Sequence, residues 1–380
     1  MKRFICLFLT FAALLTSSAY AETPSAGITP SVAAPSAVLM EKRTGEVLYE
    51  KKAHDHYFPA SVTKVMTLLL IAEDIESGKI SLDDTVTASK RAASFGGSCV
   101  YLAEGEQMTV SDMLKCIAVV SANDCAVAMA EHLSGNEELF VQRMNERASA
   151  LGLEDTHFTN CTGLFDDNNH YTSAYDVAVM SRELLRHEFI KEYTTIWMDS
   201  IRNGEFGLSS TNRLVYWYPG CTGLKTGYTS TAKYCISATA ERDGVEYIAV
   251  IMHSETADSR NADAQALLDY AFANYTLCSL RSGTPLPAIP VELGRAASVQ
   301  AVYGGPEYAL TAKTGAEPEY TLDIESSAAA PVHAGDRLGT LTVRSGGKVV
   351  ASVPVLAGED VPRLGVFGIV ALLAGRMVGL

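Results

Sequence analysis

The first two thirds of the chain combine apolar residues at helical spacing with shorter runs typical of strands. Helical spacing occurs in four stretches, at about 60–78, 109–135, 171–188 and 260–275. Strand-like runs cover 36–51, with a turn signal at Arg43-Thr44-Gly45, and 233–252, with one at Asp243-Gly244. The helices thus lie in sequence between the strands of one expected antiparallel sheet. This order predicts an α+β fold.

The last third of the chain has a different pattern. Residues 281–293 are rich in proline, and beyond them apolar and polar positions alternate, with a turn signal at Gly346-Gly347. We therefore expect a small all-β, sandwich-like domain at 285–357, after a first domain at 35–280. Residues 22–34 are small and proline-rich, which is typical of a linker.

Both ends of the chain are apolar. Residues 1–21 have a basic start, an apolar run and the ending Ala19-Tyr20-Ala21, the pattern of a secretory signal peptide. An uncleaved membrane anchor is the alternative, although the run is short for a span. Residues 361–380 predict a membrane-anchoring helix that lies in the interface on the outer face of the membrane, with glycines and Arg376 on one side. Docking of this helix onto the protein is the alternative.

Composition narrows the choice of partners. The 380 residues carry a formal net charge of −14, which argues against nucleic acid as a partner. The eight cysteines include no C-x-x-C pair, so neither a zinc site nor a redox motif is indicated. Cys6 belongs to the predicted signal peptide, and we expect most of the others to be buried small residues or free thiols.

The helix predicted near residue 60 begins with a serine and a lysine one turn apart, Ser61 and Lys64. Residues three apart share a helix face, so the two side chains can touch. Lys64 adjoins the apolar run 65–72, where poor solvation favours a neutral amine that can take a proton from a hydroxyl. Taken alone, the pair is better explained as a helix cap followed by an ordinary lysine.

Two more motifs follow in order and change that interpretation. Ser121-Ala122-Asn123 lies at a break between two predicted helices, and Lys225-Thr226-Gly227 precedes a strand hairpin. With Ser61 to Lys64 they form the S-x-x-K, S-x-N and K-T-G set of the penicillin-recognising serine enzymes. Stretches such as "PASVTKVMT" and "GCTGLKTGYTSTAKYCISATA" resemble the low-molecular-mass penicillin-binding proteins of the D-alanyl-D-alanine carboxypeptidase family, serine peptidase family S11. The resemblance covers about 35–275 and implies a β-lactamase-like transpeptidase domain.

The resemblance also implies a reaction: removal of the terminal D-alanine from peptidoglycan stem peptides, through an acyl-enzyme that β-lactams trap. No metal or cofactor is required. Ser61 is the expected nucleophile, Lys64 its general base, and Ser121 the relay of a proton to the leaving D-alanine. The enzyme would act outside the cytoplasm, on the outer face of the bacterial cytoplasmic membrane.

The same resemblance implies the substrate-binding residues. Asn123 is expected to bind an amide of the substrate, and Lys225 and Thr226 its terminal carboxylate. Gly227 leaves room for the substrate backbone along the strand edge. The backbone N–H groups of Ser61 and Tyr228 would form the oxyanion hole.

Three other residues invite a functional reading. Lys313 begins a second K-T-G, but it lies in the predicted β domain and is expected to end a strand. His170 could be a general base, but it precedes a helix cap, and Lys64 already fills the role of base. Cys221 could be a second nucleophile, but it has no activating neighbour. We expect both to be structural.

Alternative functions remain open. Ala122 stands where β-lactamases with these motifs carry aspartate, and no E-x-x-L-N stretch follows, so hydrolysis of antibiotics is not the expected task. Endopeptidase action on peptidoglycan cross-links uses the same site on a larger substrate. A catalytically silent cell-wall scaffold is the alternative from another class, and the presence of Ser61, Lys64 and Lys225 argues against it.

Overall fold

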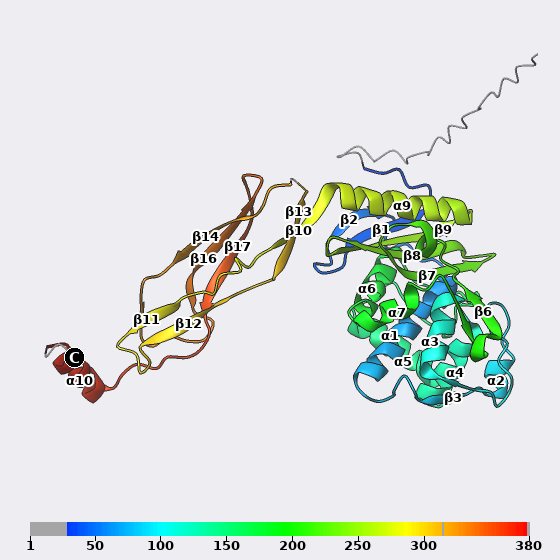
Figure 1. Cartoon of the computed structure of the whole chain (residues 1–380), viewed down its shortest axis with the longest axis horizontal. Helices are drawn as coiled ribbons and strands as arrows, with labels where there is room; N and C mark the ends of the chain where they lie inside the picture. Colours follow the sequence, from blue (N-terminus) through cyan, green and yellow to red (C-terminus); the bar gives the residue numbers. More distant parts are fainter. Residues whose placement is uncertain (1–28, 314, 378–380) are drawn as a thin grey trace, which may run out of the picture.

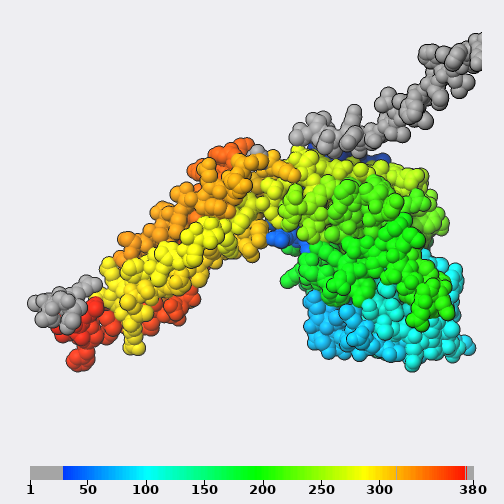
Figure 2. Space-filling model, in the orientation of Figure 1, coloured from blue at the N-terminus to red at the C-terminus, as the bar shows by residue number. Residues whose placement is uncertain are grey.

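The computed structural model describes residues 29–313 and 315–377. They form a domain of helices and strands and, beside it, an elongated domain of strands (Figure 1). The space-filling view shows the second domain as a narrower arm that extends from the first (Figure 2). The predicted signal peptide, 1–21, lies outside the described residues.

The first domain is built on a five-stranded antiparallel sheet in the order β2-β1-β9-β8-β7. Its strands are β1 Ser36–Glu41, β2 Val47–Lys51, β7 Cys221–Thr229, β8 Lys233–Arg242 and β9 Val245–Ser254. Asp243 and Gly244, with φ of 52° and 75°, form the turn between β8 and β9, as the sequence predicted. Strand β7 is at the edge of the sheet, so one side of its backbone is free to meet a ligand.

Helices cover both faces of this sheet (Figure 1). Helix α9, Ala257–Asn274, lies on one face, and a layer of shorter helices on the other. This layer contains α1 Lys64–Glu76, α2 Lys90–Ala93, α3 Val110–Val119, α4 Asn123–Ser134, α5 Glu137–Ala150, α6 Ala174–Leu184 and α7 Lys191–Thr194. The short helix α8, Leu214–Trp217, packs through Leu214 in the core on the α9 side. In β9, Ala249 and Ile251 pack in the core toward α9, whereas Ile248 and Val250 pack with the helical layer. Successive side chains of β9 point to opposite faces of the sheet and thus pack in two separate cores.

Short elements connect these helices. Three are 3-10 turns: η1 Ala60–Thr63, η2 Glu188–Ile190 and η3 Arg202–Gly204. Two are small hairpins: β3 Thr85–Thr87 with β4 Gln107–Thr109, and β5 Met198–Ile201 with β6 Phe206–Ser209.

The first helix differs from the prediction at its start. It begins at Lys64, and Ser61 lies in the 3-10 turn η1 before it. Ala60 has a φ of 46°, outside the helical region, so the chain cannot enter an α-helix at that residue. The hydroxyl of Thr63 donates to the Ala60 carbonyl at 2.8 Å and holds the tight turn. At the other end Gly78, with φ of 73°, follows the last turn as predicted.

Part of the predicted linker is docked on the first domain. Val32 and Ala34 are buried against α9. The backbone N–H groups of Ala33 and Ala34 donate to the two carboxylate oxygens of Asp263, at 3.0 and 2.9 Å. This end of the segment is therefore part of the domain surface.

The second domain is all-β, as predicted. Its strands are β10 Tyr275–Ser279, β11 Ala288–Glu292, β12 Ser298–Tyr303, β13 Tyr308–Ala312, β14 Glu319–Ile324, β15 Ala328–Ala329, β16 Arg337–Ser345 and β17 Lys348–Ala357. Six of them form a sheet in the order β14-β16-β17-β12-β11-β15, and β10 pairs with β13 next to the first domain (Figure 1). The predicted turn at Gly346-Gly347 joins β16 and β17. The domain has its own apolar core, which includes Val299, Leu341 and Val355.

The chain ends in helix α10, Val366–Met377, at the far end of the β domain (Figure 1). Val366 and Phe367 on this helix are 76% and 92% exposed. Nowhere in the described residues is a helix both long and apolar enough to cross a membrane.

Candidate active site

Ser61 and Lys64 meet at the junction of η1 and α1. The Nζ atom of Lys64 lies 3.0 Å from Ser61 Oγ, 2.6 Å from Asn123 Oδ1 and 2.8 Å from the Thr162 carbonyl. Lys64 is fully buried, whereas Ser61 is partly exposed in a cleft. The serine hydroxyl is thus the one partner of Lys64 that solvent or a substrate can reach.

The environment of Lys64 favours its neutral form. Burial lowers the pKa of the amine to about 7, although Cys161, Cys99 and Asp124 oppose the shift. A neutral amine has two N–H bonds and one lone pair. Asn123 Oδ1 and the Thr162 carbonyl can only accept, so they take both N–H bonds, and the lone pair points to the Ser61 hydroxyl. Lys64 is therefore arranged to accept the Ser61 proton.

The second motif occupies the break between α3 and α4, as predicted. Ser121 has a φ of 63°, a left-handed conformation that separates the two helices. Its Oγ atom is buried and lines the cleft, and it has no hydrogen-bond partner among the described residues. An unpaired buried hydroxyl is costly unless a ligand or water completes it. Ser121 is therefore available to a group bound in the cleft.

Asn123 is placed differently from its predicted role. Its side chain is buried, its Oδ1 accepts from Lys64, and its Nδ2 donates to the Gly96 carbonyl at 2.8 Å. Both ends of the amide are thus engaged within the protein. The geometry makes Asn123 a positioning residue for Lys64, and contact with a substrate amide stays a prediction.

The third motif lies on the edge strand β7. Lys225 is buried and donates to the Thr226 carbonyl at 3.0 Å. Its pKa is lowered well below the usual lysine value, first by burial and then by the charges of Lys64 and Arg260. Thr226 lines the cleft, and its hydroxyl donates to Thr211 Oγ1 at 2.8 Å. A carboxylate bound here would restore the charge on Lys225.

Gly227 brings this strand against the nucleophile. A Cβ atom at this position would lie 2.8 Å from the Pro59 carbonyl and 3.0 Å from the Ser61 nitrogen. The sequence predicted a glycine that leaves room for a substrate, and the structure adds a second reason, the close approach of β7 to η1. Tyr228, the next residue, is 55% exposed, and its ring packs at 4.4 Å from that of Tyr234.

A loop that sequence reasoning missed completes the pocket of Lys64. The side chain of Asn160 accepts from Thr162 N, Thr162 Oγ1 and Gly163 N, at 3.1, 3.1 and 2.6 Å. Gly163 has a φ of 70°, and a Cβ atom there would lie 1.8 Å from the Ala60 carbonyl. This turn directs the Thr162 carbonyl at Lys64. The N-x-x-G spacing of Asn160 and Gly163 was the available signal for this turn in the sequence. Lys64, which the Thr162 carbonyl contacts, lies 98 residues away along the chain.

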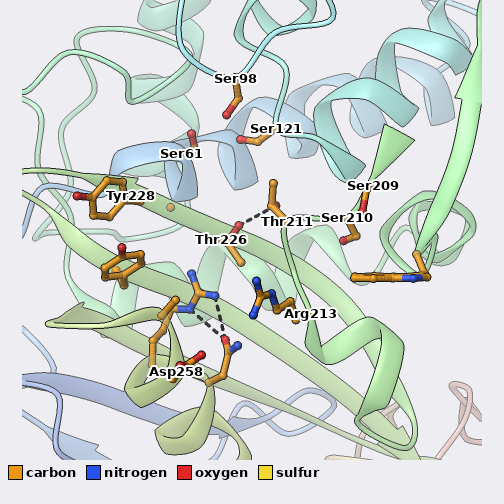
Figure 3. A pocket seen from close by; sticks show the side chains of 16 residues that line it. Ser61, Ser98, Ser121, Ser209, Ser210, Thr211, Arg213, Thr226, Tyr228 and Asp258 are labelled. Carbon is orange, nitrogen blue, oxygen red and sulfur yellow. Dashed lines mark hydrogen bonds between the residues drawn. The ribbon is translucent and has the colours of Figure 1, made fainter. Parts of the chain in front are cut away.

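The cleft itself has a volume of about 800 Å³. Ser61, Ser121, Thr226 and Tyr228 line it, together with residues from the loop after β6 and from α9 (Figure 3). Two cations that the sequence analysis did not single out, Arg213 and Arg260, also line it. Arg260 is buried, which lowers its pKa to about 10, and its guanidinium donates to Asn261 Oδ1.

The residues set aside in the sequence do not line the cleft. Lys313 follows the end of β13, and its Nζ donates to the Phe272 carbonyl at 3.2 Å. His170 is buried, contacts Thr63 Oγ1 at 2.8 Å and accepts from Thr159 N at 3.0 Å. Burial lowers its pKa to about 4, so it is a neutral structural residue. Burial raises the pKa of Cys221 to about 11, and all seven cysteines of the described part are free.

Solved structures define the class of protein. The fold matches that of penicillin-binding protein 5 from Haemophilus influenzae with a TM-score of 0.77 and 28% identity, over 89% of this chain and all of that one. It also matches the D-alanyl-D-alanine carboxypeptidase DacD from Francisella tularensis, with a TM-score of 0.68 and 26% identity, over 88% and 95% of the two chains. The fold is that of the penicillin-binding enzymes, and the chain is a serine peptidase of this class.

Sequence comparison gives the family. The family model described as D-alanyl-D-alanine carboxypeptidase, peptidase S11, matches residues 21–256, and that of the penicillin-binding protein 5 C-terminal domain matches 279–363. The chain is 41% identical over 374 residues to the D-alanyl-D-alanine carboxypeptidase DacF of Bacillus subtilis (strain 168), with 96% of each chain covered. The chain belongs to the D-alanyl-D-alanine carboxypeptidase family S11.

Proposed function

We propose that this enzyme removes the terminal D-alanine from peptidoglycan stem peptides through an acyl-enzyme on Ser61. The observation that carries the proposal is the contact between Ser61 Oγ and a buried Lys64 whose other partners are both acceptors. The family, and the relatives that resemble this chain, are named for D-alanyl-D-alanine carboxypeptidase activity. Because these relatives are named as carboxypeptidases, carboxypeptidase action is favoured over the endopeptidase and scaffold alternatives.

Acylation begins with proton transfer from the Ser61 hydroxyl to the neutral amine of Lys64. Ser61 Oγ then attacks the carbonyl carbon between the two D-alanines, and the carbonyl oxygen gains the negative charge. The backbone N–H groups of Ser61 and Tyr228 would stabilise that oxyanion. The close approach of β7 to Ser61 at Gly227 supports this pairing, because it brings the two backbone segments together.

Collapse of the tetrahedral intermediate breaks the C–N bond and needs a proton on the leaving nitrogen. The Ser121 hydroxyl faces the cleft, has no hydrogen-bond partner among the described residues, and is suited to pass a proton from the Lys64 ammonium to that nitrogen. D-Alanine leaves with its amine, and Lys64 is neutral again. Water then attacks the ester carbon, and Lys64 takes its proton. The ester C–O bond breaks, Lys64 returns that proton to Ser61 Oγ, and the peptide leaves as an acid that ionises to a new carboxylate.

Substrate orientation follows from the charges on the Thr226 side of the cleft. The carboxylate of the terminal D-alanine would lie near the Thr226 hydroxyl, with Lys225, Arg213 and Arg260 as cations. Asn123 is the proposed partner of a substrate amide, in addition to its contact with Lys64. A β-lactam would acylate Ser61 in the same way, but its leaving nitrogen stays attached to the acyl group, and so the antibiotic inhibits.

Intact-protein mass after brief incubation with benzylpenicillin tests this site. We expect one penicilloyl adduct on the wild-type protein and on Lys313→Ala, and none on Ser61→Ala. Release of D-alanine from a peptide ending in D-alanyl-D-alanine should follow the same pattern. A folded wild-type protein without an adduct would overturn the proposed function, and an adduct on Ser61→Ala would place the nucleophile elsewhere.

We also propose that the enzyme is exported and held at the outer face of the membrane. The signal peptide predicted at 1–21 supports export. The exposed apolar side chains of α10 support an anchoring role for the predicted segment 361–380, as a helix lying in the interface.

Co-sedimentation with lipid vesicles tests the anchor. The full chain should sediment, and the double variant Val366→Ser, Phe367→Ser should stay in solution with unchanged acylation by penicillin. Equal sedimentation of both would overturn the anchor.

A further inference from the structure

A buried carboxylate that the proposed reaction does not use lies close to the catalytic lysine. Asp124 follows Asn123 in the first turn of α4, and only 1% of its surface is exposed. Its hydrogen-bond partners among the described residues are all backbone N–H groups, and none of them is a cation. Burying a carboxylate without a cation costs free energy, so the contacts that it makes indicate its role.

The carboxylate of Asp124 holds a neighbouring loop, residues 96–102, by its backbone. Its Oδ2 accepts from Val100 N and from Leu102 N, each at 3.1 Å, and its Oδ1 accepts from Cys125 N at 2.9 Å. Both oxygens thus meet donors, which suits the ionised form of the group. The first turn of a helix also favours a negative charge, because its free N–H groups point out of the N-terminus.

The 96–102 loop in turn orients Asn123. The Gly96 carbonyl accepts from Asn123 Nδ2 at 2.8 Å, and the Ser98 carbonyl accepts from Asn123 N at 2.7 Å. Because Nδ2 is engaged in this way, the amide presents its oxygen to Lys64 Nζ, at 2.6 Å. Ser98 also lines the catalytic cleft (Figure 3). The loop therefore links the buried carboxylate to the base of the reaction.

A second group holds the same loop. Arg202, between β5 and β6, donates from Nη1 to the Val100 carbonyl at 2.9 Å. Its Nε lies 2.7 Å from Glu106 Oε1, so the guanidinium is itself held in place. The backbone at Val100 is thus fixed through its N–H by Asp124 and through its carbonyl by Arg202. Loss of one tie leaves the other, and we expect variants at Asp124 to fold.

Asp124 also acts on Lys64 through its charge. A negative charge near an amine favours the charged form, so Asp124 opposes the lowering of the Lys64 pKa that burial causes. Cys161 and Cys99 adjoin the same amine, but burial raises the pKa of both thiols, so both are neutral near pH 7. Lys225 is the basic group that faces it from β7. Of the acidic groups in the described residues that act on this amine, Asp124 is therefore the one that is charged at neutral pH.

We infer that Asp124 is a positioning residue for the reaction. Its carboxylate holds the 96–102 loop so that Asn123 presents its oxygen to Lys64, and its negative charge acts on that lysine. Asp124 does not line the cleft, so it acts through these other residues. The inference rests on the proposed function and deepens it, because it concerns how the base of the same site is controlled.

The pH profile of acylation by a fluorescent penicillin tests both effects. Asp124→Asn removes the charge and replaces one oxygen by an NH2 group, which cannot accept from the loop. We expect the plateau rate constant to fall about tenfold, because the base loses its alignment. The midpoint of the acid limb should move to lower pH by about half a unit, because the amine loses the charge that favours its protonated form.

Two further variants separate charge from placement. Asp124→Glu keeps the charge but places the oxygens one methylene farther out, so its plateau should fall while its midpoint stays at the wild-type pH. Asp112→Asn is the matched control, because Asp112 also lies in the first turn of a helix, α3, but pairs with Lys115 at 3.6 Å. It should keep both the plateau and the midpoint. Thermal unfolding checks that each variant is folded.

The outcomes separate this inference from the proposed function. A folded wild-type protein that forms no penicilloyl adduct would remove the function itself. If the wild-type protein is acylated, an unchanged midpoint in folded Asp124→Asn would overturn the inference, because a lower plateau alone indicates a structural role. A wild-type plateau in Asp124→Glu would overturn it whether or not Asp124→Asn folds. Failure of both variants to fold would also overturn it, because the carboxylate would then serve the fold.

Discussion

Lys64 Nζ lies 2.6 Å from Asn123 Oδ1, so the second motif of the site directly supports the base of the first. Two pure acceptors, Asn123 Oδ1 and the Thr162 carbonyl, use the N–H bonds of the amine and leave its lone pair for Ser61. The contact joins residues 59 positions apart, and it couples the position of the α3–α4 break to the reactivity of the serine.

The first prediction concerns pH. Burial lowers the pKa of Lys64 to about 7, and only the neutral amine can accept the Ser61 proton. Acylation by a fluorescent penicillin should therefore fall as the pH drops below about 7 and reach a plateau above it. Second-order rate constants between about pH 5.5 and 9 check this. A rate that keeps rising across that whole range would indicate an amine with the ordinary lysine pKa.

The second prediction concerns Gly227. A Cβ atom there meets backbone atoms of Pro59, Ser61 and Val62, none of which can rotate away. The variant Gly227→Ala should separate β7 from the Ser61 turn and slow acylation about a hundredfold, the cost expected of a displacement near 1 Å. Gly207→Ala is the matched control, because a Cβ atom at that strand position meets nothing within 4 Å. Equal rates in the two variants would contradict the close approach.

The parts of the site that sequence predicted are those that depend on local spacing. Ser61 and Lys64 are three residues apart, and a single turn of 3-10 or α-helix brings them together whatever the rest of the chain does. The Asp243-Gly244 turn likewise follows from two adjacent residues that tolerate positive φ. The type of these elements could therefore be predicted, although the exact start of α1 could not, and the helix α5 at Glu137–Ala150 was not predicted.

The parts that were missed depend on contacts between distant segments. The Asn160 turn acts on Lys64 across 98 residues, and Arg260 reaches the cleft from α9 only because that helix packs beside the end of the sheet. Neither has a local sequence pattern that distinguishes it from an ordinary turn or a surface arginine. The second role of Asn123 was missed for the same reason, since its partner lies on another helix.

The third prediction concerns Asn160. Its side-chain oxygen accepts three hydrogen bonds in a buried turn, and its loss leaves those donors unpaired. We expect Asn160→Ala to lower the free energy of unfolding by roughly 1–3 kcal/mol and to slow acylation, because the Thr162 carbonyl loses its orientation. Urea unfolding and penicillin acylation measure the two effects. Asn169→Ala, at an exposed position of the same loop, should change neither. Wild-type acylation in Asn160→Ala would show that the turn does not position Lys64.

The fourth prediction separates the hydroxyl of Ser121 from its backbone conformation. Ser121 has a φ of 63°, which glycine adopts without strain, so Ser121→Gly keeps the break between α3 and α4 while it removes the unpaired Oγ. We expect this variant to unfold at a temperature no lower than the wild-type protein. Its turnover of a D-alanyl-D-alanine peptide should fall by about 10²–10⁴, the contribution typical of a positioned proton donor.

Ser209→Ala provides the control for that fourth variant, because Ser209 also lines the cleft but has no part in the proposed proton path. It should turn over the peptide at close to the wild-type rate. Wild-type turnover in Ser121→Gly would show that the proton reaches the leaving nitrogen by another route, for which Lys64 itself is the nearest group. A large loss of thermal stability in Ser121→Gly would instead mean that the serine hydroxyl is needed for the fold, which its lack of a partner among the described residues argues against.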